Sequence, residues 1–167
     1  MTATSGSFGK SANVAVYNVP FKAGMEAEIV SEYTVGSTTE YAAIGLDTTN
    51  VIADITASSV ATGTYQTGLL NVYHDNPKSV SNVQYIIPNT GLQKAVLCTG
   101  QNNVSPRTVI LKRDENGVIT GTCNGVTLNF PTNDYITDAN EAENLYLFIG
   151  GVGTQITWKI NYFGDIR

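Results

Sequence analysis

Hydrophobic and polar residues alternate at every second position along much of the chain. In 126–130 the residues Val, Leu and Phe alternate with Thr and Asn, and in 156–162 the residues Ile, Trp, Ile and Tyr alternate with Thr, Lys and Asn. Because successive side chains of a strand point to opposite faces, this pattern is typical of antiparallel strands with one buried and one solvated face. We therefore expect Trp158 and Tyr162 to lie on the buried row of the last strand.

Turn residues separate these hydrophobic runs. The turn 114–117 (Asp-Glu-Asn-Gly) stands between the runs 108–113 and 118–123, and an Asn-Gly pair at 124–125 precedes the next run. Asn-Gly supplies the positive φ values that tight hairpin turns require. The segment 107–130 is therefore predicted to be a three-strand meander.

The same pattern continues over most of the chain and predicts an all-β protein, an antiparallel β-sandwich. Only 138–141 (Asp-Ala-Asn-Glu) favours helix, because an Asp cap followed three residues later by Glu forms a capped turn. No helical crossovers of the kind that parallel strands need are evident. Residues 1–11 are predicted to be a flexible N-terminal arm, and 12–167 a single domain. The predicted strands are 13–18, 25–34, 40–47, 51–57, 64–73, 82–87, 92–99, 107–113, 118–123, 126–130, 144–150 and 155–166.

Composition narrows the classes of function. The chain has 167 residues and a formal net charge of −5, and an acidic chain lacks the basic surface that nucleic-acid binding needs. No run approaches the roughly 18 apolar residues of a membrane span, so we expect no membrane insertion. Residues 1–7 lack the charged and apolar regions of a secretory signal, which predicts synthesis in a cytosol without export. No nucleotide-binding glycine motif and no zinc or calcium ligand spacing occurs, so no cofactor is expected.

The two cysteines, Cys98 and Cys123, both fall in predicted strands. They are too few for a disulfide framework. The favoured interpretation is two buried free thiols that pack as small hydrophobic groups. A disulfide between neighbouring strands is the second interpretation, and a metal or redox role is the third.

The C-terminal third of the chain resembles the laminin-G-like, concanavalin A-like jelly-roll family. In 109–126 a strand with a basic-acidic pair leads through a turn to a strand that ends in an Asn-Gly hairpin. In 145–151 an apolar strand ends in Gly-Gly, and 162–167 closes the chain with Gly-Asp-Ile-Arg. The resemblance implies a jelly roll of antiparallel strands. The calcium ligands of that family have no residue-by-residue counterpart in this chain.

Three glutamates are the best catalytic candidates. Glu26, Glu28 and Glu32 share one face of a predicted strand, and some jelly-roll glycoside hydrolases carry three acids on one strand. Their pattern resembles Glu-x-Asp-x-x-Glu, whereas the third glutamate here comes one residue later. We therefore interpret the three as a solvated strand face, whose carboxylates repel one another unless a basic neighbour offsets them. The chain is not expected to be an enzyme.

The candidate glycan-binding or partner-binding residues are Tyr41, Tyr65, Tyr73, His74 and Asp75. The tyrosines lie near strand ends or in loops, where aromatic rings stack on sugars or contribute to protein interfaces. His74 and Asp75 directly follow a predicted strand and are equally typical of a capped turn. Neighbouring residues of a chain do not easily form the His–Asp arrangement of a catalytic triad, and no Gly-x-Ser-x-Gly motif supplies a nucleophile.

Three functions follow from these observations, in order of preference. The first is a non-enzymatic structural or adhesion module of a virion, such as a bacteriophage decoration, head-fibre or tail-fibre protein. Its partners would be other virion proteins or surface glycans, and it would act in the virion as a symmetric homo-oligomer. The alternative is a carbohydrate-binding module or lectin. The least favoured is a glycoside hydrolase.

Overall fold

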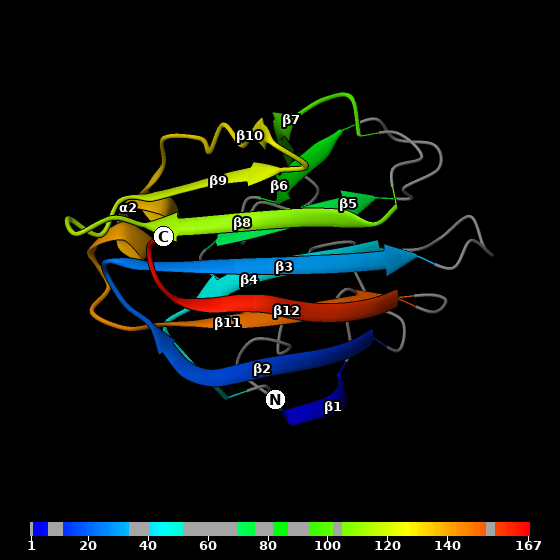
Figure 1. The fold of residues 1–167 in the computed structure, drawn as a ribbon, viewed down its shortest axis with the longest axis horizontal. Helices are drawn as coiled ribbons and strands as arrows, with labels where there is room; N and C mark the ends of the chain where they lie inside the picture. The colour runs from blue at the N-terminus through cyan, green and yellow to red at the C-terminus, as the bar shows by residue number, and fades with distance from the viewer. Residues whose placement is uncertain are drawn as a thin grey trace.

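The protein is a sandwich of two antiparallel β-sheets (Figure 1). The computed structural model describes residues 2–6, 12–33, 41–51, 70–75, 82–86, 94–101, 105–152 and 156–167. Its elements in chain order are β1 Thr2–Gly6, β2 Ala12–Phe21, β3 Met25–Tyr33, β4 Tyr41–Asp47, β5 Leu70–Asp75, β6 Val83–Ile86, β7 Lys94–Cys98, β8 Arg107–Arg113, β9 Ile119–Cys123, β10 Val126–Thr127, α2 Asp134–Glu141, β11 Leu145–Val152 and β12 Ile156–Asp165.

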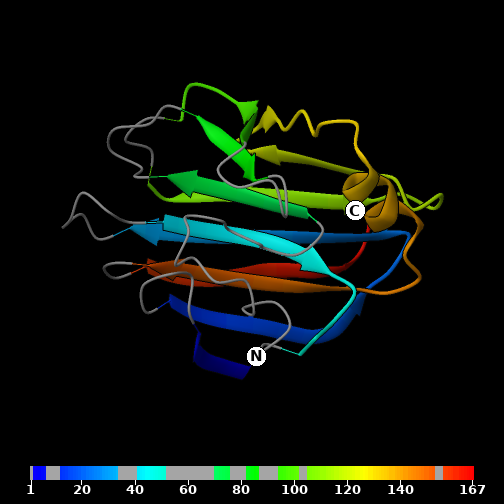
Figure 2. The ribbon, with the colours of Figure 1, turned by 180° about the vertical axis from the view of Figure 1, so that it is seen from behind.

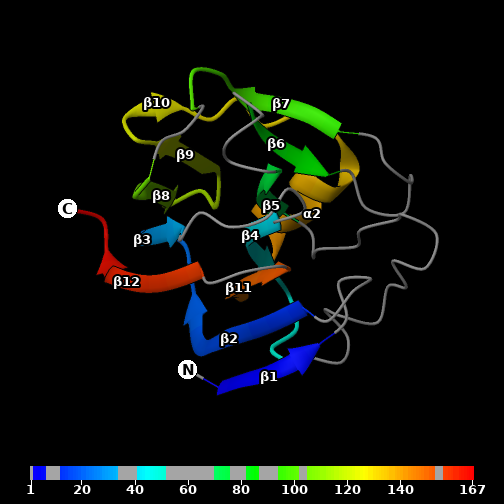
Figure 3. The same ribbon diagram turned by 90° about the vertical axis from the view of Figure 1, so that its right-hand side faces the viewer.

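The two sheets differ in the number of strands. The seven-stranded sheet has the order β1-β2-β11-β4-β5-β6-β7, and the five-stranded sheet has the order β10-β9-β8-β3-β12. The five-stranded sheet faces the viewer in Figure 1, the seven-stranded sheet faces the viewer in Figure 2, and Figure 3 shows the two layers end-on. The chain changes sheet between β2 and β3 and again between β3 and β4, so neighbours in a sheet are often distant in sequence.

The core consists of the inner rows of both sheets. Along β8 every second residue is buried, which is the pattern that a half-buried strand requires. Trp158 is half-buried and packs against this core, as its position in the sequence predicts. Inner residues with no measurable exposure include Phe21, Ala27, Ile29, Ile44, Leu46, Leu97, Val109, Leu111, Leu145 and Leu147.

Strand β12 changes register in its middle. Up to Ile160 its residues pair with β3 in step, but the next paired residue is Tyr162, which lies opposite Glu28. The extra residue, Asn161, forms a β-bulge, and a bulge reverses which side chains face inward beyond it. The expectation that Tyr162 continues the buried row is therefore wrong: Phe163 packs against the core, and Tyr162 lies on the outer face.

Helix α2 begins four residues earlier than the sequence predicts. The cap is Asn133, whose side-chain oxygen accepts a hydrogen bond from the Ile136 backbone N–H at 3.0 Å. Ile136 and Ala139 bury one face of the helix against the sandwich. The predicted turn at 138–141 is therefore the second half of a longer helix. No helix among the described residues is long and apolar enough to span a membrane.

Tyr85 of β6 lies buried in the core. Burial raises the pKa of its phenol to about 12, an effect that the Asn133 side chain partly opposes. The phenol therefore stays neutral at physiological pH. Cys98 and Cys123 are also buried there as free thiols, which confirms the favoured interpretation of the sequence.

The predicted meander is confirmed, although its third strand is short. The β8–β9 turn is closed by Asp114, whose carboxylate accepts the backbone N–H groups of Asn116 at 2.9 Å and Val118 at 2.8 Å. Gly117 has a φ of 86°, and a Cβ there would lie 2.3 Å from the carbonyl oxygen of Asn140. Only glycine fits this turn against the end of α2.

Three predictions for the first half of the chain can be compared with the structure only in part. Part of the predicted arm 1–11 is strand β1, which pairs with β2 from Thr2–Val16 to Gly6–Ala12. Residues 52–57 of the predicted strand 51–57 and residues 64–69 of the predicted strand 64–73 lie outside the described residues. The remainder of the second strand, 70–73, belongs to β5.

Candidate functional site

Mostly polar side chains form two rows across the outer face of the five-stranded sheet. One row runs from Thr120 through Lys112 to Glu26. The other row joins all five strands at Thr127, Thr122, Ile110, Glu28 and Tyr162. Residues directly opposite on neighbouring strands have their Cβ atoms about 4.5–5.5 Å apart, so each row is a continuous line of side chains.

The β3 end of these rows is an ion-pair network. Glu26 Oε2 lies 2.8 Å from Lys112 Nζ, and Glu26 Oε1 lies 2.7 Å from Arg167 Nη2. The same Arg167 nitrogen lies 2.8 Å from Glu28 Oε2, and Asn161 Nδ2 donates to Glu28 Oε1 at 3.0 Å. We call these five residues, together with Tyr162, the carboxylate cluster. Two carboxylates with two cations leave it without net charge.

Both carboxylates of the cluster are held in the charged form. Burial acts to raise the pKa of Glu26, but its hydrogen bonds and charge interactions with Lys112 and Arg167 outweigh burial and bring the pKa below its usual value. The pKa of Glu28 is lowered chiefly by the hydrogen bond from Asn161 and then by that from Arg167. Neither group therefore keeps a proton near neutral pH.

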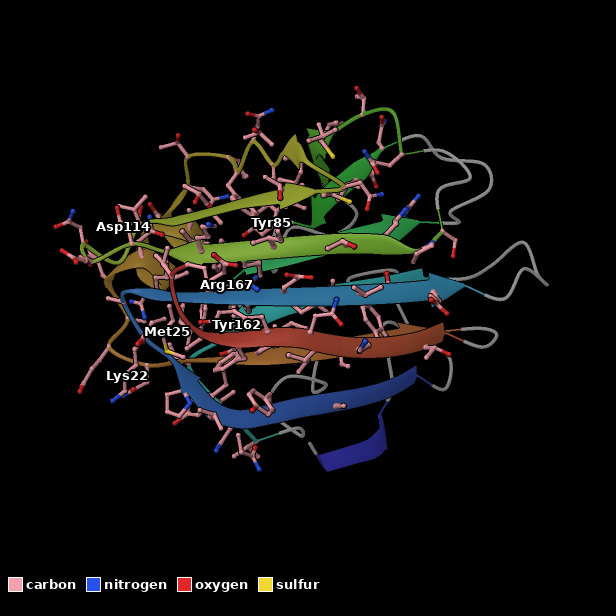
Figure 4. The ribbon with its side chains drawn as sticks, viewed as in Figure 1. Lys22, Met25, Tyr85, Asp114, Tyr162 and Arg167 are labelled. Atoms are coloured by element: carbon pink, nitrogen blue, oxygen red, sulfur yellow. The ribbon has the colours of Figure 1, made fainter. Side chains whose placement is uncertain are left out.

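The C-terminal residues fold back over this face. The Ile166 backbone N–H donates to the Gly24 carbonyl at 2.9 Å, which turns the chain end toward β3. The Arg167 guanidinium carbon lies 3.8 Å from the centre of the Tyr162 ring, and the Tyr162 hydroxyl donates to the Asp165 carbonyl at 2.6 Å. Figure 4 shows Tyr162 and Arg167 together on this face. The bulge at Asn161 is what brings the tyrosine to this side of β12.

Beside the cluster, over β8, β9 and β10, the face carries an open hollow of about 420 Å³. We call it the threonine hollow, because its lining residues are Ile110, Lys112, Thr120, Gly121, Thr122 and Thr127. Gly121 has no room for a side chain, since a Cβ would lie 2.9 Å from the Ile110 carbonyl oxygen. The hollow offers hydroxyl groups, an ammonium group and one apolar side chain to a ligand.

The residues predicted as binding candidates lie in the other sheet. Backbone register places Tyr41 opposite Asp75 and His74 opposite Ala42, at one end of the β4–β5 pair. Tyr73 is next along β5 and pairs with both Ala43 and Gln84. Tyr65 lies outside the described residues. The topology therefore brings four of the five candidates to one strand end, and their role as a binding site stays a prediction.

The interpretation of the three glutamates as a solvated strand face is wrong for Glu26, which is 2% exposed and lies against Lys112 and Arg167, but the expected basic neighbours are present. Glu26 and Glu28 both contact Arg167, which places them on the same face, and Glu32 is exposed. Sequence reasoning did not identify Lys112, Arg167 or Tyr162 as part of this site. Cross-strand pairing of the predicted strands would have suggested Lys112, but the turn-back that brings Arg167 has no local signal. No group of three or more His, Cys, Asp or Glu suited to a metal ion occurs in the described part of the chain.

Comparison with known proteins shows the fold. No protein family and no curated protein matches the sequence. The carbohydrate recognition domain of Emp46p matches with a TM-score of 0.55 at 11% identity, over 93% of this chain and 77% of that chain. A laminarinase from Flavobacterium sp. UMI-01 matches with a TM-score of 0.56 at 9% identity, over 94% and 72%. The globular domain of T. cruzi calreticulin matches with a TM-score of 0.55 at 10% identity, over 94% and 70%.

These similarities establish a concanavalin A-like jelly-roll sandwich, as the sequence resemblance implies. The solved structures include both a carbohydrate recognition domain and a laminarinase, so the fold by itself does not separate binding from catalysis.

Proposed function

We propose that the chain is a non-catalytic carbohydrate-binding domain and that it binds glycans on the outer face of its five-stranded sheet. The observation that carries this proposal is the threonine hollow, an open depression of about 420 Å³ on a solvent-facing sheet. Binding sites for small ligands usually measure about 300–1,000 Å³, so the hollow has room for a sugar unit. The similarity in fold to a carbohydrate recognition domain supports the same ligand class.

The chemistry of the hollow suits a neutral sugar. The hydroxyls of Thr120, Thr122 and Thr127 donate and accept hydrogen bonds, as sugar hydroxyls do. Ile110 lies next to Thr122 in the cross-strand row and offers its methyl groups to the apolar face of a sugar ring. Lys112 adds a donor at the edge of the hollow, where its ammonium also contacts Glu26. Threonines on adjacent strands form a rigid set of partners, because the sheet fixes their spacing.

The carboxylate cluster supports binding rather than hydrolysis. Glycoside hydrolysis needs one carboxylic acid that keeps its proton near neutral pH and a second that is ionised. In the cluster the pKa values of Glu26 and Glu28 both lie below their usual value, and Arg167 holds both carboxylates. Neither residue is therefore available as a general acid.

Of the virion role predicted from the sequence, which was structural or adhesive, we keep only adhesion as a proposal. A glycan-binding surface is what a viral adhesion module needs, whereas a structural role in a particle has no support in the solved structures of similar fold. Assembly into a homo-oligomer stays a prediction. Measuring the molecular mass of the purified protein in solution would test it.

A glycan array with matched variants tests this proposal. The double variant Thr120→Val and Thr122→Val removes two hydroxyls from the hollow while it keeps β-branched residues in the strand. We expect the wild type to bind a defined set of glycans and the double variant to lose at least tenfold in affinity. The control is Thr157→Val, which removes an exposed hydroxyl from β12, away from the hollow, and should bind as the wild type does.

Two results would contradict the proposal in different ways. No binding to any glycan would reject the function. Binding that survives in the double variant but is lost in Tyr73→Ala would keep the function and move the site to the β4–β5 strand end predicted from the sequence.

A further inference from the structure

The Tyr162 ring is fixed on the outer face of the five-stranded sheet by its own strand. Gly164 comes two residues later on β12, and a Cβ there would lie 3.1 Å from the Tyr162 hydroxyl oxygen and 3.3 Å from Cζ. The ring therefore passes over the glycine, which has no side chain in its way. The hydroxyl donates to the Asp165 carbonyl at 2.6 Å. These contacts hold the ring in one place, as a platform for stacking requires.

The guanidinium of Arg167 fills the space between this ring and two carboxylates. Its carbon lies 3.8 Å from the centre of the Tyr162 ring. Its Nε and Nη2 donate to Glu26 Oε1 at 3.2 Å and 2.7 Å, and Nη2 also donates to Glu28 Oε2 at 2.8 Å. The side chain is still 51% exposed. Because each contact of an exposed cation is weak, together they favour the covering position by about tenfold.

Turning the Arg167 side chain away does not leave a buried charge alone. The Glu26 side chain is 3% exposed, but its Oε2 keeps Lys112 Nζ at 2.8 Å. The Glu28 side chain is 22% exposed, so water reaches its carboxylate. The backbone does not have to move, since the Ile166 N–H anchors this segment to β3 through the residue before it. The space beside the Tyr162 ring can therefore open by rotation of one side chain.

This space lies on the same row of side chains as the threonine hollow. The row runs through Thr122, Ile110, Glu28 and Tyr162, which belong to β9, β8, β3 and β12. Neighbouring strands lie about 4.8 Å apart, so Thr122 and Tyr162 are about 14 Å apart. A linear oligosaccharide that lies across the strands would reach both places, whereas a single sugar would reach only one.

We propose that Tyr162, Asn161 and Glu28 form a second sugar-binding subsite for a linear, neutral oligosaccharide. The side chain of Arg167 covers this subsite until the oligosaccharide displaces it. The ring stacks on the apolar face of a sugar, the Glu28 carboxylate accepts hydrogen bonds from sugar hydroxyls, and the Asn161 amide donates one. The inference rests on the proposed function, because the first subsite is the threonine hollow. Arg167 lowers the affinity for long chains in proportion to the time that it covers the ring.

Titration calorimetry with sugars of two lengths tests the inference. The full chain and its Arg167→Ala variant are titrated with glucose, galactose, mannose and xylose and with the linear pentasaccharides of these sugars. We expect Arg167→Ala to bind at least one pentasaccharide about tenfold more tightly than the wild type does, and to bind the corresponding single sugar equally. A gain in affinity has the advantage that a damaged fold cannot produce it.

Three further variants supply the controls. Lys159→Ala removes a different exposed cation from β12 and should bind both lengths as the wild type does. Adding Tyr162→Ala to Arg167→Ala should abolish the gain for the pentasaccharide and leave the single sugar unaffected. Adding Thr122→Val to Arg167→Ala should instead weaken both lengths, because it alters the threonine hollow.

The outcomes separate this inference from the proposed function. Equal pentasaccharide binding by the wild type and Arg167→Ala, or a gain that survives loss of the Tyr162 ring, would overturn the second subsite and leave the threonine hollow in place. Binding of acidic or branched glycans on the array, with none of the tested linear sugars bound, would also overturn it. No binding to any glycan would overturn the proposed function as well.

Discussion

The Arg113→Met substitution is a sharp test of how the meander is fastened to the rest of the sandwich. The Arg113 side chain points inward from the end of β8 and is 2% exposed. Its side chain donates to four backbone carbonyl oxygens from three places in the chain: Phe21 at 3.2 Å, Gly117 at 3.3 Å, and Asn140 at 3.0 Å together with Ala142. One side chain thus joins the end of β2, the β8–β9 turn and the end of α2.

The expected loss follows from the burial of these bonds. A hydrogen bond from a charged group contributes about 1.5–3 kcal/mol to stability. The bonds to Phe21 and Gly117 are buried, whereas those to Asn140 and Ala142 are partly exposed, and water can replace them. The two buried bonds alone suggest a loss of about 3–6 kcal/mol. Burial disfavours the charged form of Arg113, as the lowered pKa of its guanidinium shows. Replacing it with an uncharged methionine removes this cost of burying a charge and so offsets part of the loss.

The net loss in the free energy of unfolding should be about 3 kcal/mol, or about 6–12 °C in melting temperature for a chain of this size. Thermal and urea denaturation, followed by circular dichroism, measure it. The matched control is Lys159→Met, which removes an exposed charge from β12 and should change stability by less than about 1 kcal/mol. If Arg113→Met melts within about 2 °C of the wild type, the four carbonyl contacts do not hold the meander and the reasoning fails.

Two further predictions concern the carboxylate cluster and the packing on the outer face of the seven-stranded sheet. The pKa values of Glu26 and Glu28 are lowered in the folded protein, so their contribution to stability is present above the unfolded value near 4.5 and is lost as the pH falls below it. The acid-induced fall in melting temperature should therefore be smaller in Glu26→Gln than in the wild type, and an equal fall in both would contradict this. A Cβ at Gly45 would lie 2.0 Å from Cζ of the buried Phe148 ring. The Gly45→Ala variant should therefore be less stable than the wild type by about 1–3 kcal/mol, which urea denaturation measures. Recovery of stability in a Gly45→Ala, Phe148→Leu double variant would confirm that the ring is the cause, and an unchanged midpoint in the single variant would refute it.

The strands of the C-terminal half followed from sequence because local signals there agree with the fold. Alternation set the two faces of β8, and the Asp-Glu-Asn-Gly turn set where β9 begins. The helix start was missed because Asn133 caps it from a stretch with few apolar residues, and Ile136 and Ala139 are buried by core residues that are distant in sequence. Tyr162 was placed on the wrong face because a bulge is a property of two paired strands rather than of one run of residues.

The candidate site was predictable only in part. The shared face of Glu26 and Glu28 follows from the period of a strand, and the need for a basic neighbour follows from charge repulsion. The identity of those neighbours depends on sheet order, since β8 and β12 flank β3 although both come much later in the chain. The threonine hollow likewise exists only once β8, β9 and β10 lie side by side.

A titration observed by nuclear magnetic resonance shows which residues of the protein a glycan contacts. Labelled protein is titrated with the strongest ligand from the glycan array, and the shifts of its backbone amides are recorded. If the glycan binds in the threonine hollow, the changes should concentrate on β8, β9 and β10 around Thr120, Thr122 and Thr127. Changes confined to the β4–β5 strand end, or no change with any glycan, would contradict it.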